Sequence, residues 1–207
     1  MVWWAMNAFS SAGYWESRYQ SGGTSGAGSC GRLAAFKAGV INTLVAQQRI
    51  ASVIDLGCGD GSLLPLLSVP GYVGVDVSPA ALARCAARCP QHSFVLFDAL
   101  ETVPAAELVL SIDVIFHLVE DAVFAGYMAS LFGHATRLVL VYASNFDRGW
   151  PSPHVRHRRF TNHVAATQPD WRLLAHEPNR YPFDPENPDD TSFADFFLFG
   201  RAGVERG

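Results

Sequence analysis

Short apolar runs separated by turn-forming residues recur along most of the chain. Continuous apolar runs rich in valine, isoleucine and leucine are typical of strands that are buried on both faces of a parallel sheet. The runs end at glycine, proline or acidic residues, which mark turns. The predicted strands are residues 50–56, 72–77, 94–99, 107–113, 137–144, 171–176 and 193–199.

Helical patterns fill several of the gaps between these strands. Apolar residues spaced by three and four predict an amphipathic helix over residues 33–48. Ser78 and Pro79 supply an N-cap and a first turn for a later helix, which Pro90 stops. The predicted helices are residues 33–48, a segment that begins after Gly61, residues 79–89 and residues 123–132. Alternating strands and helices predict an α/β fold, a doubly wound sheet with helices on both faces.

The first predicted strand runs into a turn with glycine at every second position, Gly57, Gly59 and Gly61. Glycines permit positive φ and let a ligand lie close to the backbone, and a following helix directs free N–H groups at that ligand. Dinucleotide-binding turns place the third glycine where this chain has Ser62. Asp55, inside the strand, gives no advantage to a diphosphate, but it suits a ligand that carries an ammonium and a sulfonium.

Further acids stand where later strands end: Asp76, Asp98 and Asp113. Ligands of open α/β sheets bind at the carboxyl ends of the strands, so these acids are candidate site residues. A carboxylate in the position of Asp76 can accept both hydroxyls of a ribose. The alternative for Asp76 is a helix-capping or loop acid, but Ser78 already supplies the cap.

The seven residues from Asp55 to Gly61 match the pattern acid-x-Gly-x-Gly-x-Gly, and here the chain resembles the class I S-adenosylmethionine-dependent methyltransferases. The resemblance covers about residues 14–200. It implies a Rossmann-like sheet of seven mostly parallel strands, with the last strand antiparallel. The chain is then expected to be one methyltransferase domain, 1–207, with an arm and a glycine-rich lid over 1–32 and the core over 33–203.

The resemblance also implies S-adenosylmethionine as cofactor and assigns residues to it. Asp76 would bind the adenosine ribose, and Asp98, or the backbone beside it, would bind the adenine amino group. The implied cofactor-binding residues are Asp55, Gly57, Cys58, Gly59, Asp76, Val77, Asp98, Ala99, Ser111 and Asp113.

Residues 14–32 combine an aromatic helical turn with a glycine- and serine-rich loop. The segment resembles the leader of a set of small bacterial methyltransferases, and in many class I enzymes the residues before the glycine turn close over the cofactor. We therefore expect a lid that includes Trp15, Tyr19, Gly26 and Ser29, mobile without ligand and ordered with it. A flexible linker is the alternative interpretation.

Composition narrows the range of partners. The net charge of −4 and the pI of about 5.9 disfavour a general nucleic-acid binder. The four cysteines lack the spacing of a zinc site, so we expect no metal. The apolar start Met1–Met6 is short and has no basic lead, and no uncharged run is long enough to span a membrane. A cytoplasmic protein without a membrane partner is expected; its oligomeric state is left open.

Methyl transfer to a hydroxyl requires removal of a proton, and histidine is the usual base near neutral pH. His117, four residues after Asp113, is the candidate base; a structural histidine is the alternative. Arg156 and Arg159 lie in the most basic stretch and are candidates for holding an acidic acceptor. Base methylation is disfavoured, because Ser111-Ile112-Asp113-Val114 stands where nucleic-acid enzymes often carry an Asn-Pro-Pro-Tyr type sequence.

These residues predict a methyltransferase that acts on a small molecule or a glycan precursor, at oxygen. The alternative function is a non-catalytic partner or sensor that binds S-adenosylmethionine, because such a protein would keep the same turn and the same acids.

Overall fold

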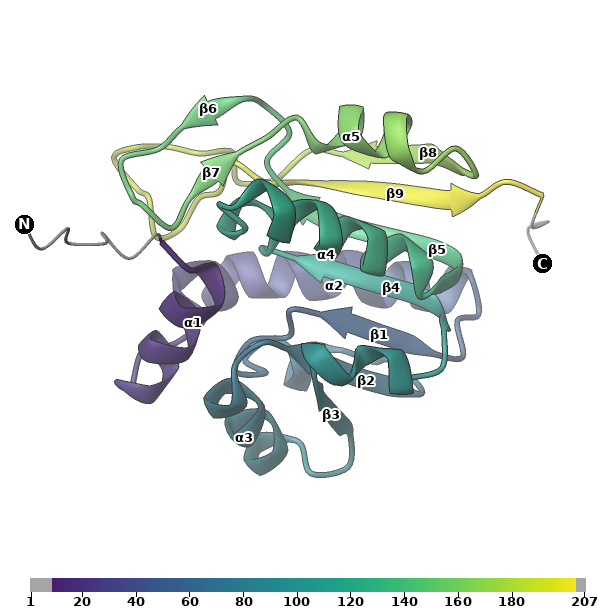
Figure 1. The fold of residues 1–207 in the computed structure, drawn as a ribbon, viewed down its shortest axis with the longest axis horizontal. Coiled ribbons are helices and arrows are strands. Elements are labelled where there is room, and N and C mark those ends of the chain that lie inside the picture. Colours follow the sequence, from purple (N-terminus) through teal and green to yellow (C-terminus); the bar gives the residue numbers. More distant parts are fainter. Residues whose placement is uncertain (1–8, 204–207) are drawn as a thin grey trace, which may run out of the picture.

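The structure is a computed structural model that describes residues 9–203. The segment Met1–Met6 and the outermost parts of the expected domain, 1–8 and 204–207, lie outside the described residues. A seven-stranded sheet occupies the centre, in the order β3-β2-β1-β4-β5-β9-β8 (Figure 1). The strands are β1 (Val53–Leu56), β2 (Tyr72–Asp76), β3 (Ser93–Leu96), β4 (Ala106–Ile112), β5 (Ala135–Ala143), β8 (Trp171–Glu177) and β9 (Asp195–Arg201).

The strand directions match the predicted Rossmann-like sheet. The strands β1 to β5 pair in parallel, and β9 lies antiparallel between β5 and β8. The mostly parallel sheet with an antiparallel last strand is therefore confirmed. A separate two-stranded ribbon pairs β6 (Arg148–Gly149) with β7 (Arg156–His157).

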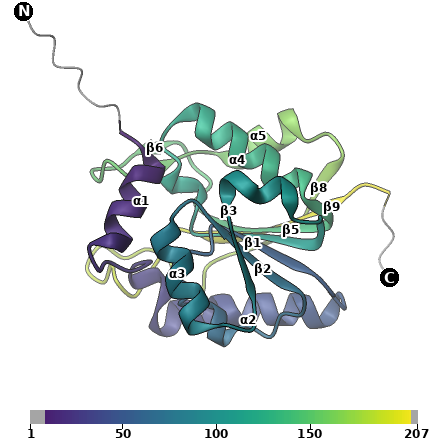
Figure 2. The same ribbon diagram turned by 60° about the horizontal axis from the view of Figure 1, so that its bottom comes forward.

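Helices cover both faces of the sheet, as predicted. Figure 2 shows α2 below the sheet and α4 and α5 above it. The helices are α1 (Ser11–Gln20), α2 (Gly31–Gln47), α3 (Pro79–Arg88), α4 (Asp121–Gly133) and α5 (Phe160–Thr167). Within residues 9–203, none of these helices is both long and apolar enough to cross a membrane.

The core lies on both faces of the central strands. Every residue of β1 is buried, and so are Val109 of β4 and Val139 of β5. Ile41 of α2 packs from one face and Met128 of α4 from the other. Burial on both faces explains why these strands read as continuous apolar runs rather than as alternating patterns.

The helix expected after Gly61 does not form, and this prediction is wrong. Only a 3₁₀ turn, Leu64–Leu66, follows the glycine turn. The Asp60 carboxylate accepts hydrogen bonds from the Ser62 N–H (3.1 Å) and hydroxyl (2.6 Å), which fixes a tight local turn. Pro65 has no N–H to donate and Pro70 interrupts soon after, so the segment is too short to nucleate an α-helix.

Candidate functional site

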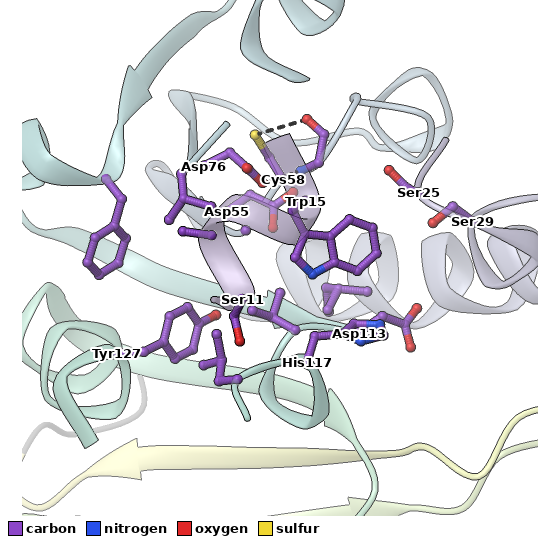
Figure 3. Close-up of a pocket in the computed structure, with 18 of the residues that line it drawn as sticks. Ser11, Trp15, Ser25, Ser29, Asp55, Cys58, Asp76, Asp113, His117 and Tyr127 are labelled. Carbon is purple, nitrogen blue, oxygen red and sulfur yellow. Dashed lines mark hydrogen bonds between the residues drawn. The ribbon is translucent and has the colours of Figure 1, made fainter. Parts of the chain in front are cut away.

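A cavity of about 330 Å³ lies at the carboxyl ends of β1, β2 and β4, under α1. Figure 3 shows Asp55, Cys58 and Asp76 on one side of it and Asp113 and His117 on the other, with Trp15 of α1 between them. Because parallel strands end at the same edge of the sheet, residues far apart in sequence meet here. The cavity is therefore the candidate site.

The glycine turn shapes one wall of the cavity. Gly57 (φ 89°) and Gly59 (φ 59°) adopt left-handed backbone conformations that disfavour other residues. A Cβ at Gly57 would collide with the Val114 side chain. The N–H groups of Gly57 and Cys58 both donate to Val75 O, at 2.7 and 3.0 Å, which ties the turn to β2.

Asp55 is buried beneath this turn with one carboxylate oxygen unpartnered. Its Oδ2 accepts a 2.9 Å hydrogen bond from the Tyr72 hydroxyl, while Oδ1 has no partner among the described residues. Burial raises the pKa of Asp55 to about 6. A buried carboxylate with a free oxygen is costly unless it is paired. Asp55 therefore favours a ligand with a positive charge.

Asp76 closes the same wall at the end of β2. Its carboxylate accepts the Gly59 and Ser78 N–H groups, each at 2.9 Å. Burial raises its pKa, whereas these backbone hydrogen bonds lower it. Each oxygen uses one lone pair on the backbone, so each can still accept a hydroxyl. Val77 also lines the cavity and is 42% exposed.

The opposite wall holds an ion pair that sequence reasoning missed. Lys37 of α2, the only lysine of the chain, is 1% exposed, and its Nζ lies 2.5 Å from Asp113 Oδ2. Asp113 has a φ of 61°. One sequence signal points to Lys37: it lies four residues from both Leu33 and Ile41, and therefore on the apolar stripe of α2.

His117 lies in the 3₁₀ turn Ile115–His117, beside Asp113. Its Nδ1 is 3.0 Å from His154 O, and since a carbonyl only accepts, Nδ1 carries the proton. The Nε2 lone pair is left free. Burial lowers the pKa of His117 to about 4, so the ring is neutral near pH 7. The ring of Trp15 packs edge-on against it at 4.8 Å.

The N-terminal arm forms the roof of the cavity. Trp15, Tyr19 and Ser29 all line it. Polar contacts also hold the arm to the core. They are Ser11 with Glu120, Glu16 with the Ser78 hydroxyl (2.5 Å), the Ser25 hydroxyl with Asp60 (2.8 Å), and Arg84 with Gly23 O (2.6 Å) and Tyr19 O.

These anchors give a testable expectation for the lid. Ser25→Ala removes the hydrogen bond to Asp60, worth about 1 kcal/mol. Limited proteolysis of the ligand-free protein should then cut within residues 21–29 about fivefold faster, because the loop opens more often. Thr24→Ala is the control, because Thr24 is exposed and its hydroxyl accepts a hydrogen bond only from the Gly26 N–H of the same loop, at 3.3 Å. Equal cleavage rates in the two variants would show that the Ser25 contact does not hold the lid.

Comparison with known proteins identifies the fold family. Residues 53–136 match the profile described as a methyltransferase domain. This match and the fold described above together show a methyltransferase domain with the fold of the class I S-adenosylmethionine-dependent methyltransferases. In a search of curated proteins, no sequence matches this methyltransferase significantly.

Solved structures share the fold at low sequence identity. Magnesium protoporphyrin IX methyltransferase from Synechocystis PCC 6803 with bound SAM is 14% identical, with a TM-score of 0.63 over 95% of this chain and 99% of that one. The N-methyltransferase NodS from Bradyrhizobium japonicum WM9 is 14% identical, with a TM-score of 0.63 over 83% and 96%. Mitomycin 7-O-methyltransferase is 18% identical, with a TM-score of 0.58 over 83% and 55%.

The cavity of this methyltransferase fits S-adenosylmethionine, the cofactor of the family. The unpartnered Asp55 Oδ1 suits the ammonium group of the cofactor, and the free lone pairs of Asp76 suit hydroxyls. No cluster of three His, Cys, Asp or Glu side chains suited to a metal occurs within residues 9–203.

Several residues that the sequence assigned to the cofactor lie outside the cavity wall of the methyltransferase. β3 ends at Leu96, so Asp98 and Ala99 fall in a 3₁₀ segment where Asp98 is exposed and Phe97 reaches the cavity instead. Ser111 is buried within β4, and its hydroxyl forms a 2.7 Å hydrogen bond with the Tyr127 hydroxyl. Gly26 is also absent from the lining, where Ser25 and Ser29 stand.

Arg156 and Arg159, assigned to the acceptor side, also lie away from this cavity. Both are exposed, and Arg156 forms a 3.0 Å ion pair with Asp121 at the start of α4. They line a separate groove on another side of that helix. The structure thus brings together Asp55, Gly57, Cys58, Gly59, Asp76, Val77, Asp113, His117, Trp15, Tyr19 and Ser29.

Proposed function

We propose that this methyltransferase transfers the methyl group of S-adenosylmethionine to an oxygen of a small molecule or a glycan precursor. The observation that carries the proposal is the convergence of the unpartnered Asp55 and the strand-end Asp76 with the neutral His117 on one cavity. S-adenosylmethionine and a hydroxyl acceptor can meet in this cavity beneath α1.

The residues divide the work of binding in this proposal. Asp55 pairs with the cofactor ammonium, Asp76 accepts the ribose hydroxyls, and the turn around Gly57 lies against the methionine part. Trp15 and Tyr19 cover the cavity and exclude water from the sulfonium. The cofactor supplies an activated methyl group, so the chain has to orient the acceptor and accept its proton.

His117 is proposed to receive that proton. With Nδ1 bound to His154 O, Nε2 is the atom that can accept a hydrogen bond from a hydroxyl. A pKa of about 4 keeps Nε2 unprotonated across the physiological range. The acceptor oxygen forms a bond to the methyl carbon, the sulfur keeps the electrons of the broken bond, and the hydroxyl proton moves to Nε2.

Mutation of His117 tests this role. His117→Gln should lower kcat by about a hundredfold, because general bases typically contribute about 10²–10⁴ in rate, and should leave S-adenosylhomocysteine affinity unchanged. His134→Gln is a matched control, since its Nδ1 also lies 3.0 Å from a carbonyl, that of Ser130. An unchanged kcat in His117→Gln would leave the histidine a structural role only.

The acceptor itself calls for a screen. Incubation with labelled S-adenosylmethionine and a small-metabolite extract should release S-adenosylhomocysteine and give a product heavier by one methyl group. Fragmentation of that product locates the methyl on oxygen or on nitrogen; methylated nitrogen would contradict the proposal. Tight cofactor binding with no turnover in any extract would favour the sensor alternative.

A further inference from the structure

A second, open groove of about 660 Å³ lies between α4, the β6–β7 ribbon and α5. Asp121, Phe124 and Ala125 of α4 face this groove, whereas Ala122, Val123 and Gly126 face the cofactor cavity. These positions lie on opposite faces of one helix. The groove is therefore separate from the methyl-transfer site, and Figure 1 shows the ribbon beside the start of α4.

Four arginines line the groove against two aspartates. Two of the arginines are already engaged: Arg156 and Arg158 each lie 3.0 Å from Asp121 Oδ1 and donate to Val119 O. Asp147 accepts the Arg159 backbone N–H at 2.9 Å. Both carboxylates therefore have partners before any ligand arrives.

The other two arginines have guanidinium groups free of ion pairs within residues 9–203. Arg148 lies over the Trp150 ring at 5.6 Å, and the Arg159 side chain has no hydrogen bond or ion pair there. Guanidinium groups present planar sets of donors that match phosphate oxygens. The groove thus has an excess of positive charge.

Buried polar atoms at the groove also lack partners. His157 is 2% exposed, with Nδ1 2.7 Å from the Ser144 hydroxyl and Nε2 unpartnered, and the adjacent Arg158 Nε is also buried and unpartnered. When the Ser144 hydroxyl donates to Nδ1, Nε2 carries a proton, so both atoms are donors. Unpaired buried donors are costly, and an acceptor-only ligand would relieve them.

We propose that this groove binds a phosphoryl group, held by the free arginines Arg148 and Arg159 above the buried donors of His157 and Arg158. A phosphoryl dianion offers three acceptor oxygens and no competing donor. The group could come from the methyl acceptor or from a separate small-molecule effector. The site does not depend on the proposed methyl transfer.

Calorimetry with inorganic phosphate and pyrophosphate tests the site. The unchanged protein should bind pyrophosphate, and the double variant Arg148→Gln/Arg159→Gln should bind it at least tenfold more weakly. Arg49→Gln, at the end of α2, is the control and should bind as the unchanged protein does. Unaltered affinity for S-adenosylhomocysteine in all variants shows that the cofactor cavity is intact. Absence of binding, or equal binding in the double variant, overturns the proposal.

Two further experiments then distinguish the source of the phosphoryl group. Phosphatase treatment of the metabolite extract should abolish product formation where the acceptor carries the group. Where the group belongs to an effector, product still forms, and added pyrophosphate changes its rate in the unchanged protein but not in the double variant. The calorimetric result decides the site itself even when no extract supports turnover.

Discussion

Asp55→Asn should bind S-adenosylmethionine about thirtyfold to a hundredfold more weakly, a loss of about 2–3 kcal/mol for a charge-assisted contact. The same variant should raise the free energy of unfolding of the ligand-free protein. The reason is that Asp55 is buried with Oδ1 unpartnered, so its ionised form is costly until a cation arrives. Binding and stability are thus expected to change in opposite directions.

The raised pKa of Asp55 determines how the stability of the ligand-free protein changes with pH. The pKa of Asp55 rises from 3.8 to about 6 on folding. Between these two pH values the Asp55 carboxyl is therefore protonated in the folded protein and ionised in the unfolded chain. Ligand-free stability from this group falls as pH rises towards 6, by up to about 3 kcal/mol. Asp55→Asn removes this loss but buries an amide, which has a cost of its own. The free energy of unfolding of the variant should therefore exceed that of the unchanged protein by about 1–2 kcal/mol above about pH 7, and by little near about pH 4.

Urea unfolding at about pH 5 and about pH 8 checks the predicted change in stability, and calorimetry at the same pH values checks the predicted change in cofactor affinity. In the unchanged protein, cofactor affinity should increase across this range as Asp55 ionises. Asp98→Asn is the control, because that acid is exposed outside the cavity. Equal stability of Asp55→Asn and the unchanged protein at about pH 8 would argue against a costly buried charge.

Lys37→Met should lower the free energy of unfolding by about 2–3 kcal/mol, because it leaves Asp113 without its buried partner. Methionine keeps much of the volume, so the cavity left behind is small. The Asp113 side chain is 23% exposed, so water recovers part of the lost interaction and the loss stays below that of a fully buried pair.

Two comparisons isolate the ion pair from other effects of the substitution. Arg137→Met removes a more exposed pair with Glu107 and should cost under about 1 kcal/mol. Lys37→Met/Asp113→Asn removes both charges and should recover about half of the loss or more. Urea unfolding measures all three. A cost in Lys37→Met no greater than that in Arg137→Met would mean that the pair contributes little.

The sheet was largely predictable because its strands are buried on both faces. Continuous apolar runs identified β1, β4 and β5 directly from the residues. The antiparallel direction of β9 came from the resemblance, since an apolar run does not encode direction. The missing helix after Gly61 depended on competition between the Asp60 turn and Pro65, which periodicity does not measure.

The site was predictable where it depends on the edge of the sheet. Asp55, Asp76 and Asp113 meet because parallel strands end together, and that rule needs only the sequence. Lys37 was missed because its partner is 76 residues away. Asp98 was placed at a strand end, but β3 stops two residues earlier at Leu96. The sequence thus missed Lys37 because its contact is with a distant residue, and misplaced Asp98 because β3 is shorter than the apolar run.

The polar anchors of the arm set an order of events during synthesis. Ser11 binds Glu120, 109 residues later, and Lys37 pairs with Asp113. The arm is translated well before Glu120, so it completes its contacts only after α4 has begun to emerge. Until then the arm has no completed surface to pack on, and Lys37 remains hydrated. The roof of the cavity is translated before the walls beneath it, and its contacts are complete only after those walls have been made.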